Sequence, residues 1–120
     1  MDPFASFIGT LFQSRNQAHI YHLQTQSFAA HLALQAYYEG IVDLADGLVE
    51  SYQGRYGILR GYKMEGIIKE DDNPIMYFEA LCKFVEGIRT KVPQDSYIQN
   101  EIDNVVGLIE STKYKLKTLH

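Results

Sequence analysis

Hydrophobic residues recur along this chain at spacings of three and four, which is the period of an amphipathic α-helix. Near the N-terminus the positions that follow this period are Phe4, Phe7, Ile8, Leu11 and Phe12. Asp2 offers a capping oxygen directly before Pro3, and proline is favoured at the first position of a helix. The pattern therefore predicts a helix from Pro3 to about Thr25.

A second helical segment follows a short break at residues 25–27. Ser27 is a suitable N-cap, and the chain from there to about Gln53 contains no proline. The apolar positions that keep the helical period are Leu34, Tyr37, Tyr38, Ile41, Leu44, Ala45, Leu48 and Val49. At ~1.5 Å per residue, this second helix would be about 40 Å long.

Two further helices are predicted in the second half of the chain. The third begins at Asn73 and Pro74 and continues to about Val92, where the next residue is a proline. Either Asp95 or Ser96 caps the fourth helix. The inward positions of these two helices are Ile75, Phe78, Leu81, Cys82, Val85, Ile88, Ile98, Ile102, Val105, Leu108, Ile109 and Leu116.

The connections between these helices indicate how they are arranged. The first two helices, and the last two, are joined by about three residues, which makes each pair antiparallel. Between the pairs, residues 54–73 carry four glycines and end in Asp71, Asp72 and Asn73, so they are expected to be irregular. A single crossover of this length is the connectivity of ferritin-like bundles. We therefore expect one all-α domain over residues 1–120, a ferritin-like antiparallel four-helix bundle with one long crossover between its second and third helices.

The composition narrows the class of protein. The formal net charge of −4 disfavours a surface that grips nucleic acid phosphates. The single cysteine, Cys82, permits neither an internal disulfide nor a cysteine-rich zinc site. No apolar run approaches the roughly 18 residues of a membrane span, and the N-terminus lacks the basic region of a secretion signal. We expect a soluble, cytoplasmic protein that binds neither nucleic acid nor membrane.

Three histidines lie around the first predicted turn. His22 comes just before the turn and His31 just after it, so we expect them at nearly the same height on antiparallel helices. His19 is one turn before His22 and shares its face. Paired neutral imidazoles from adjacent helices are a reasonable start to a transition-metal site. The alternative is that they are polar or hydrogen-bonded residues at a helix end.

Two carboxylates, Asp46 and Glu50, share one face of the second helix in an otherwise nearly apolar segment. Like charges at this spacing repel mildly, so the pair favours a cation, although a solvated helix face carries the same pattern. His31 and Asp46 are about 22 Å apart along one helix, whereas metal ligands lie roughly 2 Å from their ion. A two-fold dimer with antiparallel second helices would bring the histidines of one chain to the carboxylates of the other.

These residues resemble the Dps mini-ferritins, loosely over the whole chain and specifically from His19 to Glu50. That family carries an HxxHW segment, a histidine on the second helix, and an Asp-x-x-x-Glu pair fifteen residues after that histidine. Here the string HIYHL, His31, and the pair Asp46 and Glu50 follow the same order. The resemblance implies His22 and His31 as ligands from one subunit and the two carboxylates from the other. His19 is the alternative to His22, because it preserves the family's twelve-residue spacing to His31.

The resemblance also implies a function. We expect a ferroxidase-type site between two subunits, where peroxide or oxygen oxidises Fe²⁺ to Fe³⁺ for iron storage or oxidative protection, with no catalytic residue beyond the metal ligands. Zn²⁺ or Mn²⁺ would also bind such ligands. The expected partners are copies of the chain, as a dimer or a larger shell. Compact ferritin-like proteins encoded by phages are similar too, which would place the protein in a host cytoplasm. The alternative is a non-enzymatic oligomeric helical protein, such as a phage component, that retains the fold.

Overall fold

The computed structural model describes residues 2–64, 66–70 and 73–119. The regular secondary structure of these residues is helical, with no strand, as the hydrophobic pattern predicted. The molecule measures 44 × 26 × 21 Å. Its four helices are α1 (Pro3–Gln24), α2 (Phe28–Tyr56), α3 (Pro74–Ile88) and α4 (Ser96–Thr118). None of these helices is both long and apolar enough to cross a membrane.

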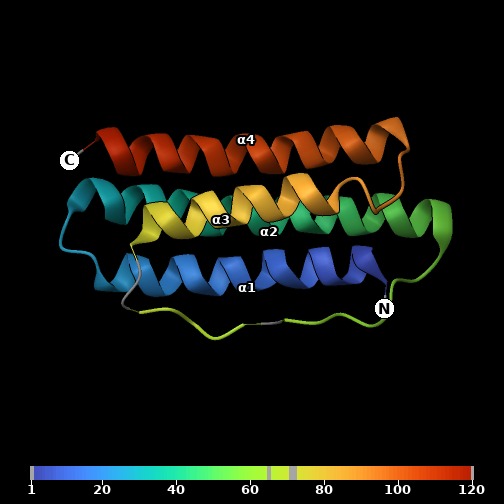
Figure 1. Cartoon of the computed structure of the whole chain (residues 1–120), viewed down its shortest axis with the longest axis horizontal. Coiled ribbons are helices and arrows are strands. Elements are labelled where there is room, and N and C mark those ends of the chain that lie inside the picture. The colour runs from blue at the N-terminus through green and yellow to red at the C-terminus, as the bar shows by residue number, and fades with distance from the viewer. Residues whose placement is uncertain (1, 65, 71–72, 120) are drawn as a thin grey trace.

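The four helices pack side by side as a bundle (Figure 1). α1 and α4 run in one direction, and α2 and α3 run in the other. Along the edges of the bundle, α1 packs on α2, α2 on α4, and α4 on α3, while the contact between α1 and α3 is the least extensive. Every packed pair is therefore antiparallel, and the two parallel pairs lie across the diagonals.

A long crossover, residues 57–73, returns the chain from the end of α2 to the start of α3. Its described residues run beside α1 along the length of the bundle (Figure 1). The expected crossover is confirmed, but it begins later than residue 54 because α2 continues to Tyr56. Gly57 ends that helix with φ at 95°, a conformation that favours glycine. Asp71 and Asp72, expected at the end of this connection, lie outside the described residues.

Side-chain caps start three of the four helices at the predicted places. In α1, the Asp2 carboxylate accepts a hydrogen bond from the Phe4 N–H at 2.9 Å. In α2, the Ser27 hydroxyl accepts from the Ala30 N–H at 3.2 Å. In α3, the Asn73 amide oxygen accepts from the Ile75 N–H at 2.8 Å. Asp95 precedes α4 but makes no side-chain cap bond. Its carboxylate accepts instead from the Tyr56 hydroxyl at 2.5 Å, which ties the start of α4 to the end of α2.

The third helix ends at Ile88, so the prediction that it continues to about Val92 was wrong. The Arg89 carbonyl accepts from the side-chain amides of Gln94 and Gln99, at 2.9 and 3.0 Å, rather than from a further helical N–H. The link to α4 is consequently residues 89–95, longer than the expected three. Both amides belong to residues that follow the helix, and their hydrogen bonds to the Arg89 carbonyl stabilise the turn after α3.

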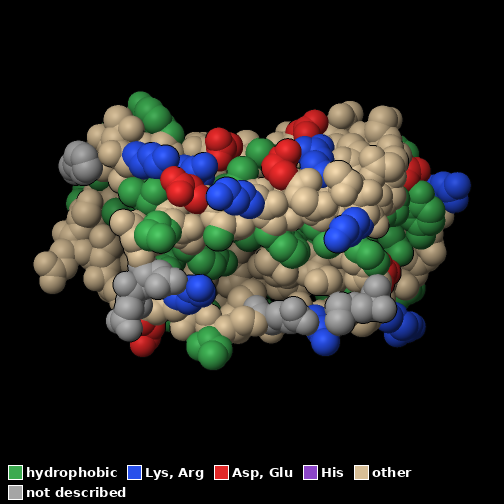
Figure 2. Space-filling model, in the orientation of Figure 1, with side chains coloured by type: hydrophobic (Ala, Val, Ile, Leu, Met, Phe, Trp, Pro, Cys, Tyr) green, Lys and Arg blue, Asp and Glu red, His purple; other side chains and the backbone are tan. Residues whose placement is uncertain are grey.

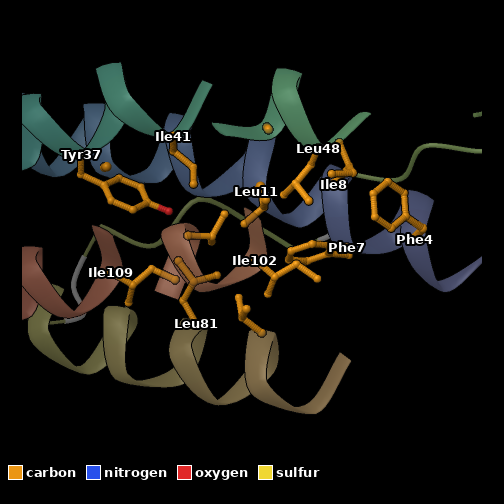
Figure 3. Packing of buried hydrophobic residues seen from close by; sticks show 14 of the residues in the cluster. Phe4, Phe7, Ile8, Leu11, Tyr37, Ile41, Leu48, Leu81, Ile102 and Ile109 are labelled. Carbon is orange, nitrogen blue, oxygen red and sulfur yellow. The ribbon is translucent and has the colours of Figure 1, made fainter. Parts of the chain in front are cut away.

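The core fills the centre of the bundle with aliphatic and aromatic side chains from all four helices (Figure 3). One polar pair lies within it. The Tyr37 hydroxyl is fully buried, 2.6 Å from Ser14 Oγ, and Ser14 donates its own proton to the Leu11 carbonyl at 2.7 Å. Tyr37 must therefore be the donor to Ser14. Burial raises the pKa of Tyr37 well above its ordinary value.

The crossover lies against α1 at a position that only glycine allows. A Cβ on the buried Gly9 would lie 1.9 Å from the backbone oxygen of Lys63, far inside van der Waals contact. Further along, Gln17 of α1 bonds both backbone groups of Lys69: Nε2 donates to the carbonyl at 2.6 Å, and Oε1 accepts from the N–H at 2.7 Å. The crossover is thus fixed to α1 by close packing and by hydrogen bonds.

Candidate functional site

The turn between α1 and α2 brings His22 and His31 into direct contact. His22 lies in the last turn of α1 and His31 near the start of α2, joined through only residues 25–27. Their rings stack with centroids 3.6 Å apart and an interplanar angle of 23°. His22 Nδ1 lies 2.7 Å from the His31 carbonyl oxygen, and His31 Nδ1 lies 3.0 Å from the His22 carbonyl oxygen. The expectation that these two residues lie at one height is confirmed.

These reciprocal hydrogen bonds assign the tautomer of both rings. A carbonyl oxygen only accepts, so Nδ1 of His22 and of His31 must carry the proton. In a neutral imidazole this leaves Nε2 as the nitrogen with a free lone pair. Metal-binding histidines commonly donate a hydrogen bond from their other nitrogen in this way, which fixes the orientation of the ring and raises the basicity of the ligand nitrogen. The two rings therefore have the protonation pattern of Nε2 ligands.

The stacking of His22 on His31 limits how they could share an ion. Two imidazoles on one tetrahedral ion have ring centroids about 5 Å apart, because each Nε2 lies about 2 Å from the metal. The observed separation is 3.6 Å. In the stacked arrangement the two rings thus do not chelate one ion, and joint binding requires the stack to open.

His19 and Tyr38 extend this pair into an aromatic cluster. The His19 ring stacks on Tyr38 with centroids 4.5 Å apart, and His22 meets Tyr38 edge-on at 5.3 Å. Partial removal from water, followed by the charge of Arg15 and by His22, lowers the pKa of His19. His19 makes no hydrogen bond to a described residue, so it lacks the backbone anchor that His22 has. His19 and His22 lie with centroids 6.0 Å apart, on the shared face that their spacing predicted.

Asp46 and Glu50 lie together nearer the other end of α2. Both are exposed and line a surface pocket of about 320 Å³, whose other lining residues are Phe12, Val49 and Tyr62. Neither carboxylate has an ion pair or hydrogen bond with any residue that the structure describes. Tyr62 comes from the crossover and stacks on Phe12 at 6.2 Å. Helical periodicity gives no signal for Tyr62, because only the path of the crossover brings this residue to α2.

One chain gathers the predicted ligands into two separate groups. His22, His31 and the neighbouring His19 surround the α1–α2 turn, while Asp46 and Glu50 line the pocket beside the crossover. Within residues 2–64, 66–70 and 73–119, no three His, Cys, Asp or Glu side chains lie close enough to hold a metal ion. Any site that uses both groups must therefore include a second chain.

This geometry defines a helical bundle with two separated groups of potential ligands. A model of a family of unknown function (DUF5856) matches residues 22–116, so the chain belongs to that family. The matched region includes His22 but not His19. The chain is also similar to an uncharacterized 14.6 kDa protein from the mobD–ri intergenic region of Enterobacteria phage T4. The two are 26% identical over 110 residues, which cover 92% of this chain and 84% of the relative. No solved structure matches the chain.

Proposed function

We propose that two copies of this protein bind iron between them and oxidise Fe²⁺ there. His22 and His31 of one copy would face Asp46 and Glu50 of the other. The observation that carries the proposal is the reciprocal bonding of the two histidines, which occupies both Nδ1 atoms and leaves both Nε2 atoms as acceptors. Imidazole nitrogen with carboxylate oxygen is a ligand set that suits Fe²⁺, and also Zn²⁺ and Mn²⁺.

The arrangement of helices supports assigning the bundle to the ferritin-like type. α1 and α2 form one antiparallel pair, α3 and α4 another, and a crossover beside α1 connects them. In ferritin-like bundles, metal sites are built from inward or facing side chains on such helices. Here the histidines and carboxylates stand on α1 and α2, so the proposed second copy would pack against these two helices.

A two-fold arrangement follows from the distance along α2. His31 and Asp46 are separated by about 22 Å along the helix axis. If the α2 helices of two copies pack antiparallel, the histidine end of each faces the carboxylate end of its partner, and two equivalent sites form. The unpaired negative charges of Asp46 and Glu50 favour such an arrangement only with cations present, because like charges on one face repel. Metal binding and dimerisation are therefore expected to strengthen each other.

In the proposed reaction, iron is the substrate. Two Fe²⁺ ions give one electron each to hydrogen peroxide; its O–O bond breaks, and two Fe³⁺ ions and two hydroxide ions result. Dioxygen is the alternative oxidant. The protein's part is to bind and orient the ions through imidazole and carboxylate groups, and no other side chain is assigned an acid or base role.

A second candidate function is that of a non-enzymatic oligomeric helical protein. The observation that favours it is that the His22–His31 pair is complete without a metal: both Nδ1 atoms are bonded and the rings are stacked. In that case the role of the pair is structural, and its two hydrogen bonds stabilise the turn between α1 and α2. The exposed Asp46 and Glu50 would be a solvated helix face.

Metal titration distinguishes the two candidates. Fe²⁺ is added anaerobically to the wild-type protein, bound iron is measured, and oxidation is then followed by absorbance after air or peroxide is added. The iron site predicts saturable binding, near one ion or two per chain, that Asp46→Ala and His31→Asn each abolish. Glu39→Ala serves as the matched control, since Glu39 is an exposed carboxylate of α2 outside the proposed site. If the wild type binds no iron, or if the site variants bind as much as the control, the iron site is refuted.

A further inference from the structure

A second feature of the molecule, independent of the histidines, is a cavity between α1, α3 and the crossover. Its volume is about 440 Å³, within the ~300–1,000 Å³ range of small-molecule sites. Hydrophobic side chains gather between α3 and the crossover on the face shown in Figure 2, and no described histidine is visible there. Because α1 and α3 make the least extensive helix contact of the bundle, it is the crossover that closes this side.

The crossover is held over the cavity by two glutamines of α1. Gln17 is 1% exposed, and its amide makes two short hydrogen bonds to the backbone of Lys69. Gln13, one turn earlier, donates from Nε2 to the Gly66 carbonyl at 3.3 Å. These bonds fix the position of the crossover relative to α1, so the cavity is formed before any ligand enters. They also engage both glutamine amides, which leaves the lining mostly apolar.

The chemistry of the lining indicates the kind of ligand. Its apolar members come from both α3 and the crossover, and include Ile67, Met76, Leu81 and Phe84. Among the described lining residues, Lys69 alone carries a charge. A charged ligand would lose more hydration here than this lining could replace, because burying an ion is costly unless it is paired and hydrogen-bonded. An uncharged, mainly apolar molecule fits.

One polar group in the lining is available to such a molecule. Tyr77 of α3 packs edge-on against Tyr21 and Phe78, and its hydroxyl makes no hydrogen bond to any described residue. Burial raises the pKa of Tyr77, so the hydroxyl keeps its proton at neutral pH and can donate. The Tyr77 hydroxyl is therefore a donor that a ligand acceptor in the cavity can engage, which adds one hydrogen bond to the binding.

We propose that this cavity is a binding site for an uncharged, mainly apolar small molecule whose single hydrogen-bonding group contacts the Tyr77 hydroxyl. The crossover covers one side of the cavity, and α1 and α3 line its other sides. Lipophilic molecules with one hydroxyl, carbonyl or amine group belong to this class. The proposal does not depend on iron binding, since it rests on a different face and on different residues.

The probe for a first test is N-phenyl-1-naphthylamine, a neutral molecule that fluoresces strongly in apolar surroundings. Wild-type protein is expected to bind it saturably at one site per chain. Ala80→Phe and Thr10→Phe add a ring to the cavity from opposite walls, and each is expected to abolish saturable binding. Ala29→Phe is the matched control, because Ala29 lines a different apolar surface pocket beside Leu32 and Leu119. Circular dichroism and thermal unfolding establish that each variant is folded.

A second measurement tests the hydrogen bond. Naphthalene and 2-naphthol are compared as competitors that displace the probe. Wild-type protein is expected to prefer 2-naphthol, and Tyr77→Phe to lose about two- to tenfold of that preference, the worth of one neutral hydrogen bond. The proposal is overturned if the wild type shows no saturable binding, or if folded Ala80→Phe and Thr10→Phe bind as the control does. An unchanged preference in Tyr77→Phe overturns the role given to its hydroxyl.

Discussion

His22 and His31 are joined by two hydrogen bonds that mirror each other across the α1–α2 turn, each ring donating from Nδ1 to the backbone carbonyl of the other residue. This relationship gives the two ring nitrogens separate roles. Nδ1 fastens the turn, whereas Nε2 remains available to a metal ion. Substitution by asparagine or glutamine separates the roles, because the asparagine amide nitrogen lies near the position of Nδ1 and that of glutamine lies near Nε2.

His31→Asn is therefore expected to keep the hydrogen bond to the His22 carbonyl and lose iron binding. His31→Gln loses that bond and should destabilise the protein by about 1 kcal/mol more than His31→Asn. Urea unfolding gives the stabilities, and anaerobic titration gives bound iron. If His31→Asn binds iron as the wild type does, Nε2 of His31 is not a ligand. If the two variants are equally stable, the Nδ1 bond does not contribute to stability.

Gly9 is predicted to be essential to the position of the crossover. In Gly9→Ala the new methyl group would overlap the Lys63 carbonyl oxygen, so the crossover must move away from α1. We expect a loss of about 1–3 kcal/mol in the free energy of unfolding, which is the range for overpacking a close contact. Hydrogen exchange should also become faster across residues 60–70.

Gly107→Ala is the control for this prediction. Gly107 is exposed in α4, and a Cβ there meets no atom within 4 Å. Alanine favours the helix, so this variant should be more stable than the wild type by up to about 1 kcal/mol. A Gly9→Ala protein as stable as Gly107→Ala would contradict the close approach of the crossover to α1.

Tyr37→Phe tests the buried hydrogen bond to Ser14 and its dependence on pH. At neutral pH the variant should lose about 1 kcal/mol of stability, because the Ser14 hydroxyl loses its donor. Burial raises the pKa of Tyr37 above its ordinary value of 10.0. The unfolded chain therefore releases this proton at a lower pH than the folded protein does, so the contribution of Tyr37 is complete below about pH 10 and is lost as the pH rises further.

The measurement is urea unfolding of both proteins from about pH 8 to pH 12, a range that spans the ordinary tyrosine pKa. The wild type should lose stability more steeply than Tyr37→Phe above about pH 10. The other tyrosines are common to both proteins, so the difference isolates Tyr37. Parallel curves across this range would show that its hydroxyl is not buried as described.

The sequence was sufficient for features that depend on neighbouring residues. Asp2, Ser27 and Asn73 cap helices through bonds to N–H groups two or three residues away, so their sequence context predicts the starts of α1, α2 and α3. The contact between His22 and His31 was predictable as well, because a three-residue turn fixes the heights of the flanking helix ends. The ferritin-like assignment and the iron ligands rest on resemblance and stay predictions.

Features that depend on distant segments were not predictable in this way. The end of α3 is set by amides of Gln94 and Gln99 that fold back on Arg89, and helical periodicity does not report such bonds. The sequence shows that Gly9 lies inside a helix, but it does not show why a glycine is needed there. The cause is the close approach of the Lys63 backbone. The position of Tyr62 beside Asp46 likewise requires the path of the crossover.

The measurement that tests the shared iron site most directly is a subunit-mixing experiment. His31→Asn and Asp46→Ala proteins are each expected to be folded and unable to oxidise Fe²⁺, because every homodimer of either variant has two defective sites. In a mixed dimer one site has lost both ligands and the other has kept both. Random pairing makes half of the dimers mixed, so mixing should restore about a quarter of the wild-type sites.

Subunit exchange is verified first, with one variant labelled and the mixed dimers detected by mass. For a site shared between two chains, the mixture is expected to oxidise Fe²⁺ at about a quarter of the wild-type level. A site contained in one chain predicts no recovery, since every chain in the mixture is defective. No recovery after confirmed exchange would contradict the shared site.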